Sequence, residues 1–299
     1  MNVLLLNNYF SIGSLKIYYY ALCIVGGILA AAGLSVPLFK KRGYKSDILL
    51  DLLIAIIPCS IVFARLWYVV FDLEEFTRGA ENVGEFLLAV IDTRSGGMAI
   101  YGGVLGGALG IFIISKIKKI PFAAIADVGA TMLPLGQAVG RLGNFFNQEV
   151  YGSVITDPSL QHFPFAVFIE ADGAYHEALC FKEMFFNLIV FALLYAFAML
   201  YNGKRNGYSI GAYFFFYGLI RSIMETQRSE KFNMGTELLG LPLMTWFSIL
   251  LSACGVAIIV SLVVLDKKSG NEWWKTFFKR NNKKTNANDG EINAADGEK

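Results

Sequence analysis

Seven apolar runs, each about 20 residues long, are the feature that most restricts how this chain can fold. A helix needs about 20 apolar residues to cross the hydrocarbon core of a bilayer, so each run predicts one crossing. The composition agrees, because only 17% of the residues are charged, whereas soluble domains carry roughly 25%. We therefore expect an all-α integral membrane protein with about seven transmembrane helices, near residues 17–39, 49–71, 97–115, 122–145, 184–201, 208–227 and 242–265.

The basic residues predict the orientation of these helices. Lysines and arginines cluster after the first, third, fifth and seventh runs, whereas an acidic loop follows the second run. Cytoplasmic loops carry the excess of lysine and arginine, so we expect the N-terminus outside and the C-terminus inside. Residues 1–270 then form one seven-helix membrane domain, with 146–183 as a small extracytoplasmic head and 271–299 as a basic, partly disordered cytoplasmic tail.

The third run is rich in glycine, at Gly102, Gly103, Gly106, Gly107 and Gly110. Small residues at an interface let two membrane helices approach closely. We therefore expect this helix to pack tightly against a neighbouring one.

The cysteines and histidines form no metal-binding pattern. The four cysteines are scattered, no CxxC occurs, and the two histidines, His162 and His176, lie in one polar region. Such spacing predicts neither a disulfide framework nor a zinc site. We expect a surface role for both histidines, no metal and no cofactor. The net charge of +2 does not indicate nucleic-acid binding, so we expect no nucleic-acid partner.

Charged and polar side chains collect at the outer ends of the predicted helices. They are Tyr18 to Tyr20, Arg65, Arg141, Asn144, Asn147, Glu149, Glu183, Arg221, Glu225 and Arg228. Ionisable groups within membrane spans are costly, so they point to function. Arginines at helix ends also extend toward lipid headgroups without any role in a functional site. This alternative to a site role stays open for Arg65 and Arg228. Asp51 and Asp127 lie at the opposite ends and are interpreted as boundary residues.

Arg221, Glu225 and Arg228 share one face of a helix, because they are four and three residues apart. A structural ion pair explains two of them and leaves one cation in excess. Several arginines at the level of the headgroups suit an anionic phosphate, which guanidinium binds in bidentate fashion. The residues thus predict a site for an anionic lipid or a phosphorylated solute, open to the outer leaflet.

A transporter or channel for a phosphorylated solute is one alternative. It predicts charges at the midplane of the bilayer, with paired repeats or broken helices, and the sequence has neither feature. A non-catalytic lipid-binding scaffold, or an enzyme of another phospholipid reaction, uses the arginines equally well. Neither of these explains the motif that follows.

Residues 140–152 read GRLGNFFNQEVYG. This stretch resembles the signature of the prolipoprotein diacylglyceryl transferases, with matches at Arg141, Gly143, Asn144, Phe145, Asn147, Glu149 and Gly152. Further blocks agree in order to about residue 265: FSIGSLKIYYYA at 10–21, Ala64-Arg65-Leu66, GGMAIYGGVLGG at 96–107, and Tyr217-Gly218 with Arg221, Glu225 and Arg228. One block departs from the family, because Lys182 replaces the tyrosine that precedes Glu183, so no role is carried over to Glu183.

The resemblance implies a transferase of the bacterial cell membrane. Enzymes of this family move the diacylglyceryl group of phosphatidylglycerol onto the lipobox cysteine thiol in the signal peptide of a prolipoprotein. A thioether forms, glycerol phosphate leaves, and lipoprotein maturation begins. The reaction needs no metal or other cofactor.

The resemblance also implies roles for individual residues. Arg141 and Arg221 are expected to stabilise the leaving phosphate, and Glu225 belongs to the same catalytic set. Tyr101, where the family carries His or Tyr, or Glu149 is expected to activate the thiol. The expected substrate-binding residues are Tyr20, Arg65, Asn144, Asn147, Gly152 and Arg228.

Overall fold

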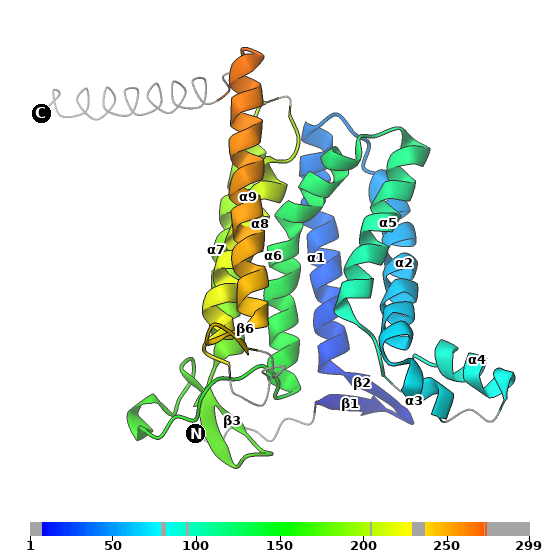
Figure 1. Ribbon diagram of the computed structural model, residues 1–299, viewed down its shortest axis with the longest axis vertical. Coiled ribbons are helices and arrows are strands. Elements are labelled where there is room, and N and C mark those ends of the chain that lie inside the picture. Colours follow the sequence, from blue (N-terminus) through cyan, green and yellow to red (C-terminus); the bar gives the residue numbers. More distant parts are fainter. Residues whose placement is uncertain are drawn as a thin grey trace, which may run out of the picture. The chain divides into compact units, whose positions relative to one another are not determined.

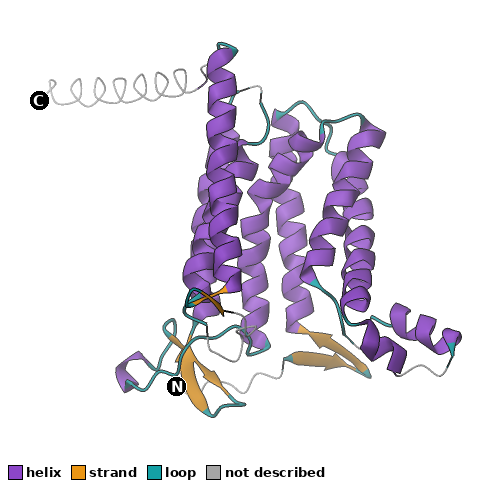
Figure 2. Cartoon of the chain, viewed as in Figure 1, coloured by secondary structure: helices purple, strands orange, loops and turns teal. Residues whose placement is uncertain are grey.

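Figure 1 shows the computed structural model of the chain, which describes residues 8–78, 82–93, 96–203, 205–228, 237–271 and 273. The chain divides into two compact units. We call Val36–Ala126 the inserted unit, and Met1–Ser35 together with Asp127–Lys299 the main unit. Helices dominate the described part of both units (Figure 2).

The long helices correspond to the predicted apolar runs. The helices wholly or mostly in the main unit are α1 (Tyr19–Lys41), α6 (Phe122–Phe146), α7 (Leu179–Leu200), α8 (Tyr208–Glu225) and α9 (Leu243–Lys268). Those of the inserted unit are α2 (Ile48–Phe71), α3 (Leu73–Arg78), α4 (Val83–Ile91) and α5 (Ile100–Lys118). Within the described residues, six helices are long and apolar enough to cross a membrane, namely α1, α2, α5, α6, α7 and α9. The helical membrane class is confirmed, while the number of crossings and the orientation stay predictions.

Short antiparallel hairpins accompany the helices and are not predicted by the apolar runs (Figure 2). They are β1 (Tyr9–Ile12) with β2 (Leu15–Tyr18), β3 (Ala166–Ile169) with β4 (Ala174–Glu177), and β5 (Glu237–Leu238) with β6 (Leu241–Pro242). The second hairpin and a 3-10 helix, Pro158–Leu160, lie within the predicted head. In that hairpin Gly173 has a φ of 60°, a conformation that glycine adopts without steric cost.

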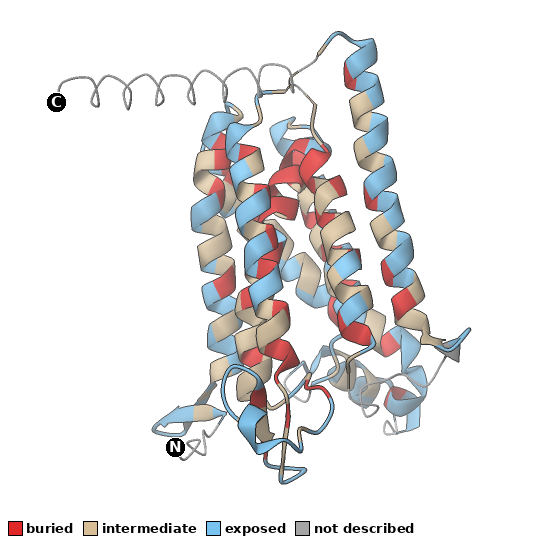
Figure 3. Ribbon diagram, turned by 90° about the vertical axis from the view of Figure 1, so that its left-hand side faces the viewer, coloured by how far each residue is buried: buried red, intermediate tan, exposed pale blue. Residues whose placement is uncertain are grey.

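The burial pattern of α9 suits a helix with lipid on its outer side. Its large apolar side chains, such as Phe247 and Leu250, are exposed, as are many residues along the other helices (Figure 3). Its buried positions are small or polar residues: Thr245, Ser248, Gly255 and Asp266. Lipid tails are as apolar as leucine, so membrane helices bury small residues to pack closely and leave large apolar ones outside.

Helices α2 and α5 pack closely within the inserted unit. A Cβ atom placed on Gly102 or Gly106 would lie 2.2 Å from a backbone carbonyl oxygen of α2, that of Phe63 or Cys59 respectively. Gly110 continues the spacing, with the backbone of α2 at 2.8 Å from such an atom. Glycine at every fourth position lets two helices meet at their backbones. The predicted close packing of this glycine-rich helix is confirmed.

Gly106→Ala should destabilise the inserted unit, because its methyl group has no room against the backbone of α2. Overpacking of this kind costs about 1–3 kcal/mol. The matched control is Gly103→Ala, whose Cβ would meet its nearest neighbour at 3.8 Å. Thermal unfolding in detergent should give a lower midpoint for Gly106→Ala alone. Equal midpoints for the two variants would show that the close approach contributes nothing.

Asp127 ties α6 to the first turn of α8. The carboxylate is buried, and its Oδ1 accepts hydrogen bonds from the backbone N–H groups of Ser209 at 2.8 Å and Ile210 at 3.1 Å. These N–H groups have no partner within their own helix. The carboxylate therefore caps a neighbouring helix, and the interpretation of Asp127 as a residue at the membrane boundary stays a prediction. Asp51, the other boundary residue, pairs with Lys118 at 2.6 Å.

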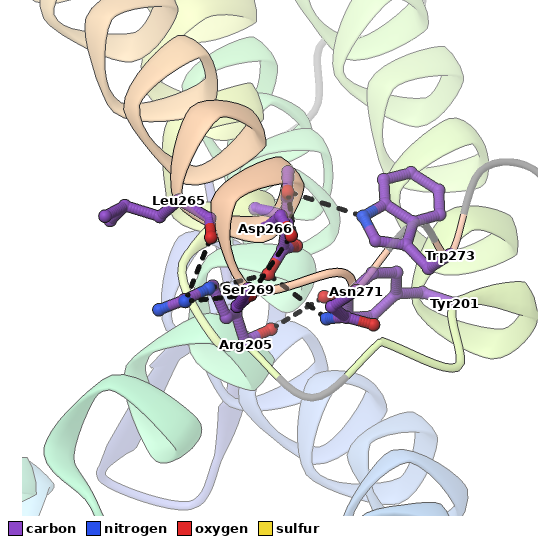
Figure 4. A network of polar contacts seen from close by, with 8 residues as sticks. Tyr201, Arg205, Leu265, Asp266, Ser269, Asn271 and Trp273 are labelled. Atoms are coloured by element: carbon purple, nitrogen blue, oxygen red, sulfur yellow. Dashed lines mark hydrogen bonds and ion pairs between the residues drawn. The ribbon is translucent and has the colours of Figure 1, made fainter.

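A second buried carboxylate, Asp266, lies near the end of α9 (Figure 4). Its two oxygens accept hydrogen bonds from Nε of Arg205 at 2.6 Å and from the hydroxyl of Tyr208 at 2.8 Å. The indole N–H of Trp273 donates to the same hydroxyl at 3.4 Å. Trp273 belongs to the predicted tail, of which 272 and 274–299 lie outside the described residues, so the disorder of that tail stays a prediction.

Candidate functional site

Five charged side chains from α6, α7, α8 and the turn after α8 meet within the main unit. Glu183 lies at the centre: one carboxylate oxygen pairs with Nη2 of Arg141, and the other lies 3.8 Å from Arg221 and 4.0 Å from Arg228. Glu225 pairs with Arg221 at 2.8 Å and with Arg228 at 3.5 Å. We call these five residues the arginine cluster.

The arginine cluster is withdrawn from solvent and keeps a positive charge. The two glutamate side chains are 4% exposed, and the arginines outnumber them by one. Burial, and then the neighbouring Arg221, lowers the pKa of Arg228, because both disfavour its charged form. Arginine nevertheless stays a cation at any physiological pH. An anion bound here would relieve the repulsion between the guanidinium groups.

Several buried atoms of the cluster have no aligned hydrogen bond within the described residues. They are Nε of Arg141, Oε1 of Glu183, Oε2 of Glu225 and Nε of Arg228. Buried polar groups nearly always have partners, and the pairs that Arg228 makes at 3.5 Å and 4.0 Å are long for direct hydrogen bonds. The guanidinium groups therefore have donors left for the oxygen atoms of a ligand.

Polar side chains that end α6 and follow it extend the cluster. Nη1 of Arg141 donates to Oδ1 of Asn144 at 2.9 Å. The Asn144 amide donates in turn to Oε2 of Glu149 at 3.2 Å, and the Asn147 amide donates to Oε1 at 3.3 Å. Two amides thus hold one exposed carboxylate. The structure brings together these four residues, which the sequence analysis assigns to one site.

The backbone on both sides of Glu149 has an unusual conformation. Gln148 has a φ of 53° and Val150 a φ of 59°, in the left-handed region that is uncommon outside glycine and an outlier for a β-branched residue. Such strain costs about 1–3 kcal/mol per residue and tends to occur at functional sites. This strain supports a functional role for the carboxylate between the two residues.

Tyr20 and Gly152 also belong to the main unit. A Cβ atom on Gly143 would lie 2.5 Å from the ring of Tyr20, so the missing side chain lets that ring lie against the end of α6. Gly152 is packed as tightly, since a Cβ atom there would lie 2.8 Å from the carboxylate of Glu177 and 3.0 Å from the carbonyl oxygen of Gln227. Both glycines are therefore required for packing. Substrate contacts of Tyr20 and Gly152 stay predictions.

Arg65 and Tyr101 belong to the inserted unit. Arg65 is buried, and its guanidinium donates four hydrogen bonds of 2.7–2.9 Å to the backbone carbonyl oxygens of Ala89, Val90, Gly96 and Gly97. The first two belong to the last turn of α4, where carbonyl groups have no partner within the helix. These contacts give Arg65 a structural role. Its role in binding substrate stays a prediction, as does the role of Tyr101, an exposed residue in the first turn of α5.

Arg65→Lys should loosen the end of α4, because one ammonium group cannot replace a planar fork that reaches four carbonyl groups. Hydrogen exchange should become faster at the α4 amides, while transfer activity falls less than for a substitution of Arg141. Arg78→Lys is the control, since the Arg78 side chain is 76% exposed. Unchanged exchange in Arg65→Lys would show that the four bonds do not hold the segment.

Two residues lie where the sequence analysis does not expect them. The surface interpretation is wrong for His176, which is 4% exposed because the β3–β4 hairpin places its ring against the carbonyl group of Gly152. Glu183, to which no role was carried over, is the central residue of the arginine cluster. The position of Glu183 at the start of an apolar run could have indicated this role, because a carboxylate buried there needs cationic partners.

The fold is that of a helical membrane protein, and three arginines and two glutamates meet in a cluster withdrawn from solvent. Comparison with known families identifies the protein further. The chain belongs to the prolipoprotein diacylglyceryl transferase family, whose sequence model matches residues 7–261.

Individual relatives agree with this assignment. The chain is 32% identical over 253 residues to the phosphatidylglycerol–prolipoprotein diacylglyceryl transferase of Streptococcus pneumoniae (strain Hungary19A-6), which covers 83% of this chain and 91% of the relative. It is 36% identical over 228 residues to phosphatidylglycerol–prolipoprotein diacylglyceryl transferase 1 of Clostridium perfringens (strain 13 / Type A), covering 74% of this chain and 82% of the relative. The family predicted from residues 140–152 is thus confirmed.

Proposed function

We propose that this protein transfers the diacylglyceryl group of phosphatidylglycerol to the lipobox cysteine thiol of a prolipoprotein, the first step of lipoprotein maturation. Its family supports the reaction, and the arginine cluster is the observation that supports the site. The donor headgroup is a phosphodiester with one negative charge, which matches the single positive charge in excess among the five residues. Guanidinium groups suit this ligand because their forked donors fit two phosphate oxygens.

The reaction requires a stabilised leaving group and an activated thiol. The sulfur attacks the carbon of the diacylglyceryl group that is bonded to the phosphate oxygen, so a carbon–sulfur bond forms. The carbon–oxygen bond breaks, its electron pair leaves with glycerol phosphate, and the thiol proton passes to a base. Arg141 and Arg221 stabilise the charge that develops on the phosphate, where preorganised donors have their largest effect. Arg228 contributes to the same positive field, and Glu183 and Glu225 orient the three guanidinium groups.

Glu149 and Tyr101 are the two candidates for activating the thiol. The nucleophile is the thiolate, so a proton acceptor near the incoming cysteine is needed. Glu149 is an exposed carboxylate held by two amides, which suits it to receive that proton. A phenol is mostly protonated near neutral pH, so Tyr101 is better suited to donate a hydrogen bond to the phosphate.

Tyr101→Phe should slow transfer about 10- to 1000-fold, because one oriented donor is lost. Tyr101→His retains a ring donor, so it should keep more activity than the phenylalanine variant. Single-turnover rates with saturating donor lipid measure both. A Tyr101→Phe variant as fast as the parent would remove the hydroxyl from the chemistry and leave Glu149 as the base.

The membrane side of the site follows from the basic loops. With the N-terminus outside, the arginine cluster lies near the outer leaflet of the bacterial cell membrane, where a secreted precursor presents its lipobox. Right-side-out membrane vesicles test this, because a peptide added from outside should be modified only if the site faces that side.

The reaction itself is tested with purified protein, phosphatidylglycerol and a peptide that carries a lipobox cysteine. We expect the peptide mass to rise by one diacylglyceryl group, with no rise when serine replaces the cysteine. Lipid binding without any change in peptide mass would overturn the proposal in favour of a non-catalytic lipid-binding protein.

A further inference from the structure

The reaction described above makes no use of His176, yet this buried histidine contacts the signature sequence directly. The residue lies on β4 opposite Val167. Its Nδ1 lies 2.9 Å from the carbonyl oxygen of Gly152, to which a ring protonated at Nδ1 donates a hydrogen bond. Its Nε2 lies 3.3 Å from Oδ2 of Asp172, without an aligned hydrogen bond within the described residues.

The same aspartate also holds the residue that precedes Gly152. Tyr151 is buried and donates its hydroxyl to Oδ2 of Asp172 at 2.9 Å. The rings of Tyr151 and His176 pack with their centroids 4.5 Å apart. One Asp172–His176 pair therefore fixes two consecutive residues, Tyr151 through its side chain and Gly152 through its backbone.

Gly152 links this pair to the residues of the proposed reaction. Its N–H donates to the carbonyl oxygen of Glu177 at 3.0 Å, and its backbone forms a β-bridge with Arg228. Arg228 extends its guanidinium into the arginine cluster. Gly152 also follows Glu149 by three residues, and the strained Val150 lies between them. A shift of Gly152 would therefore displace a carboxylate on one side and a guanidinium on the other.

We propose that His176 is a positioning residue for the transferase reaction. Its hydrogen bond to Gly152 holds Glu149 and Arg228 in the geometry that the reaction requires. The inference rests on the proposed function of those two residues. A displacement of about 1 Å at a reacting group can cost about 100-fold in rate, so loss of this bond lowers turnover even where the protein stays folded.

Two amide variants separate the two ring contacts of His176. The amide nitrogen of His176→Asn takes the place of Nδ1 and still donates to Gly152, whereas the amide of His176→Gln replaces Nε2 and leaves Gly152 without its donor. We expect His176→Asn to keep kcat within about threefold of the parent, and His176→Gln to lose about 10- to 100-fold with little change in KM for phosphatidylglycerol. His162→Gln is the matched control, because this exposed histidine lies in the same head segment, and it should leave transfer unchanged.

The unfolding midpoint in detergent is measured beside each rate. Equal losses in the Asn and Gln variants, or parent-like turnover in both, would overturn the proposal, because the Nδ1 bond would then make no difference. If the His176→Gln variant does not fold, Tyr151→Phe is tested in its place. This variant removes only the hydrogen bond from the Tyr151 hydroxyl to Asp172. Reduced kcat there supports the positioning role, and parent-like kcat overturns it. Absence of transfer by the parent protein would instead refute the proposed function. Failure of the proposed function and failure of the positioning role of His176 therefore give different results.

Discussion

Arg141→Lys is expected to lower the rate of transfer about 100- to 1000-fold while the protein stays folded and inserted in the membrane. Lysine keeps the positive charge but lacks the planar fork. In the parent, that fork reaches Glu183 with one nitrogen and Asn144 with another, so its direction toward a ligand is fixed. A single ammonium group cannot hold both partners and the phosphate at once.

The measurement is the single-turnover rate of peptide modification at saturating phosphatidylglycerol. Arg78→Lys is the control, because it makes the same chemical change at an exposed arginine on α3. Turnover of Arg141→Lys close to that of the parent would remove Arg141 from the catalytic residues and leave it a partner of Glu183.

Glu183→Gln should have the largest effect on stability. Its carboxylate is almost fully buried and faces three guanidinium groups. Glutamine keeps the shape but removes the charge, so the arginines repel one another with only Glu225 left among them. Removal of one partner from a buried ion pair costs about 3–5 kcal/mol. The variant should also lose transfer activity, because Arg141 loses the partner that orients it.

Thermal unfolding and transfer are measured on the same preparations. Glu74→Gln is the matched control, since it breaks an exposed pair with Arg78 and such pairs contribute little. If phosphatidylglycerol restores the unfolding midpoint of Glu183→Gln, the lipid phosphate has supplied the missing negative charge. A midpoint equal to that of the parent without lipid would contradict the central place of Glu183.

The sequence predicted the features that depend on local spacing. Apolar runs of about 20 residues predict the long helices because bilayer thickness sets their length. Arg221 and Glu225 pair as expected because residues four apart share a helical face. Asn144 and Glu149 meet because they lie within one turn and one short loop of each other. Both contacts join residues that lie only a few positions apart in the sequence, so local spacing is enough to predict them.

Contacts between distant segments could not be predicted in the same way. The pairing of Glu183 with Arg141 requires that α6 and α7 be placed side by side, and no local spacing sets that placement. The inward position of His176 depends on a hairpin whose strands are only four residues long, too short to give a clear alternating pattern. The hydrogen bonds of Arg65 could not be predicted either, because the carbonyl groups of α4 that it binds lie 24 and 25 residues further along the chain.

A structure of the protein with phosphatidylglycerol bound tests most directly whether the arginine cluster holds the donor phosphate. We expect phosphate oxygens within about 3 Å of guanidinium nitrogens of Arg141 and Arg221. The carbon of the diacylglyceryl group that is bonded to the phosphate oxygen should be accessible to a thiol on the side of Glu149. A phosphate held elsewhere, with these arginines still paired only to Glu183, Glu225 and Asn144, would contradict the account.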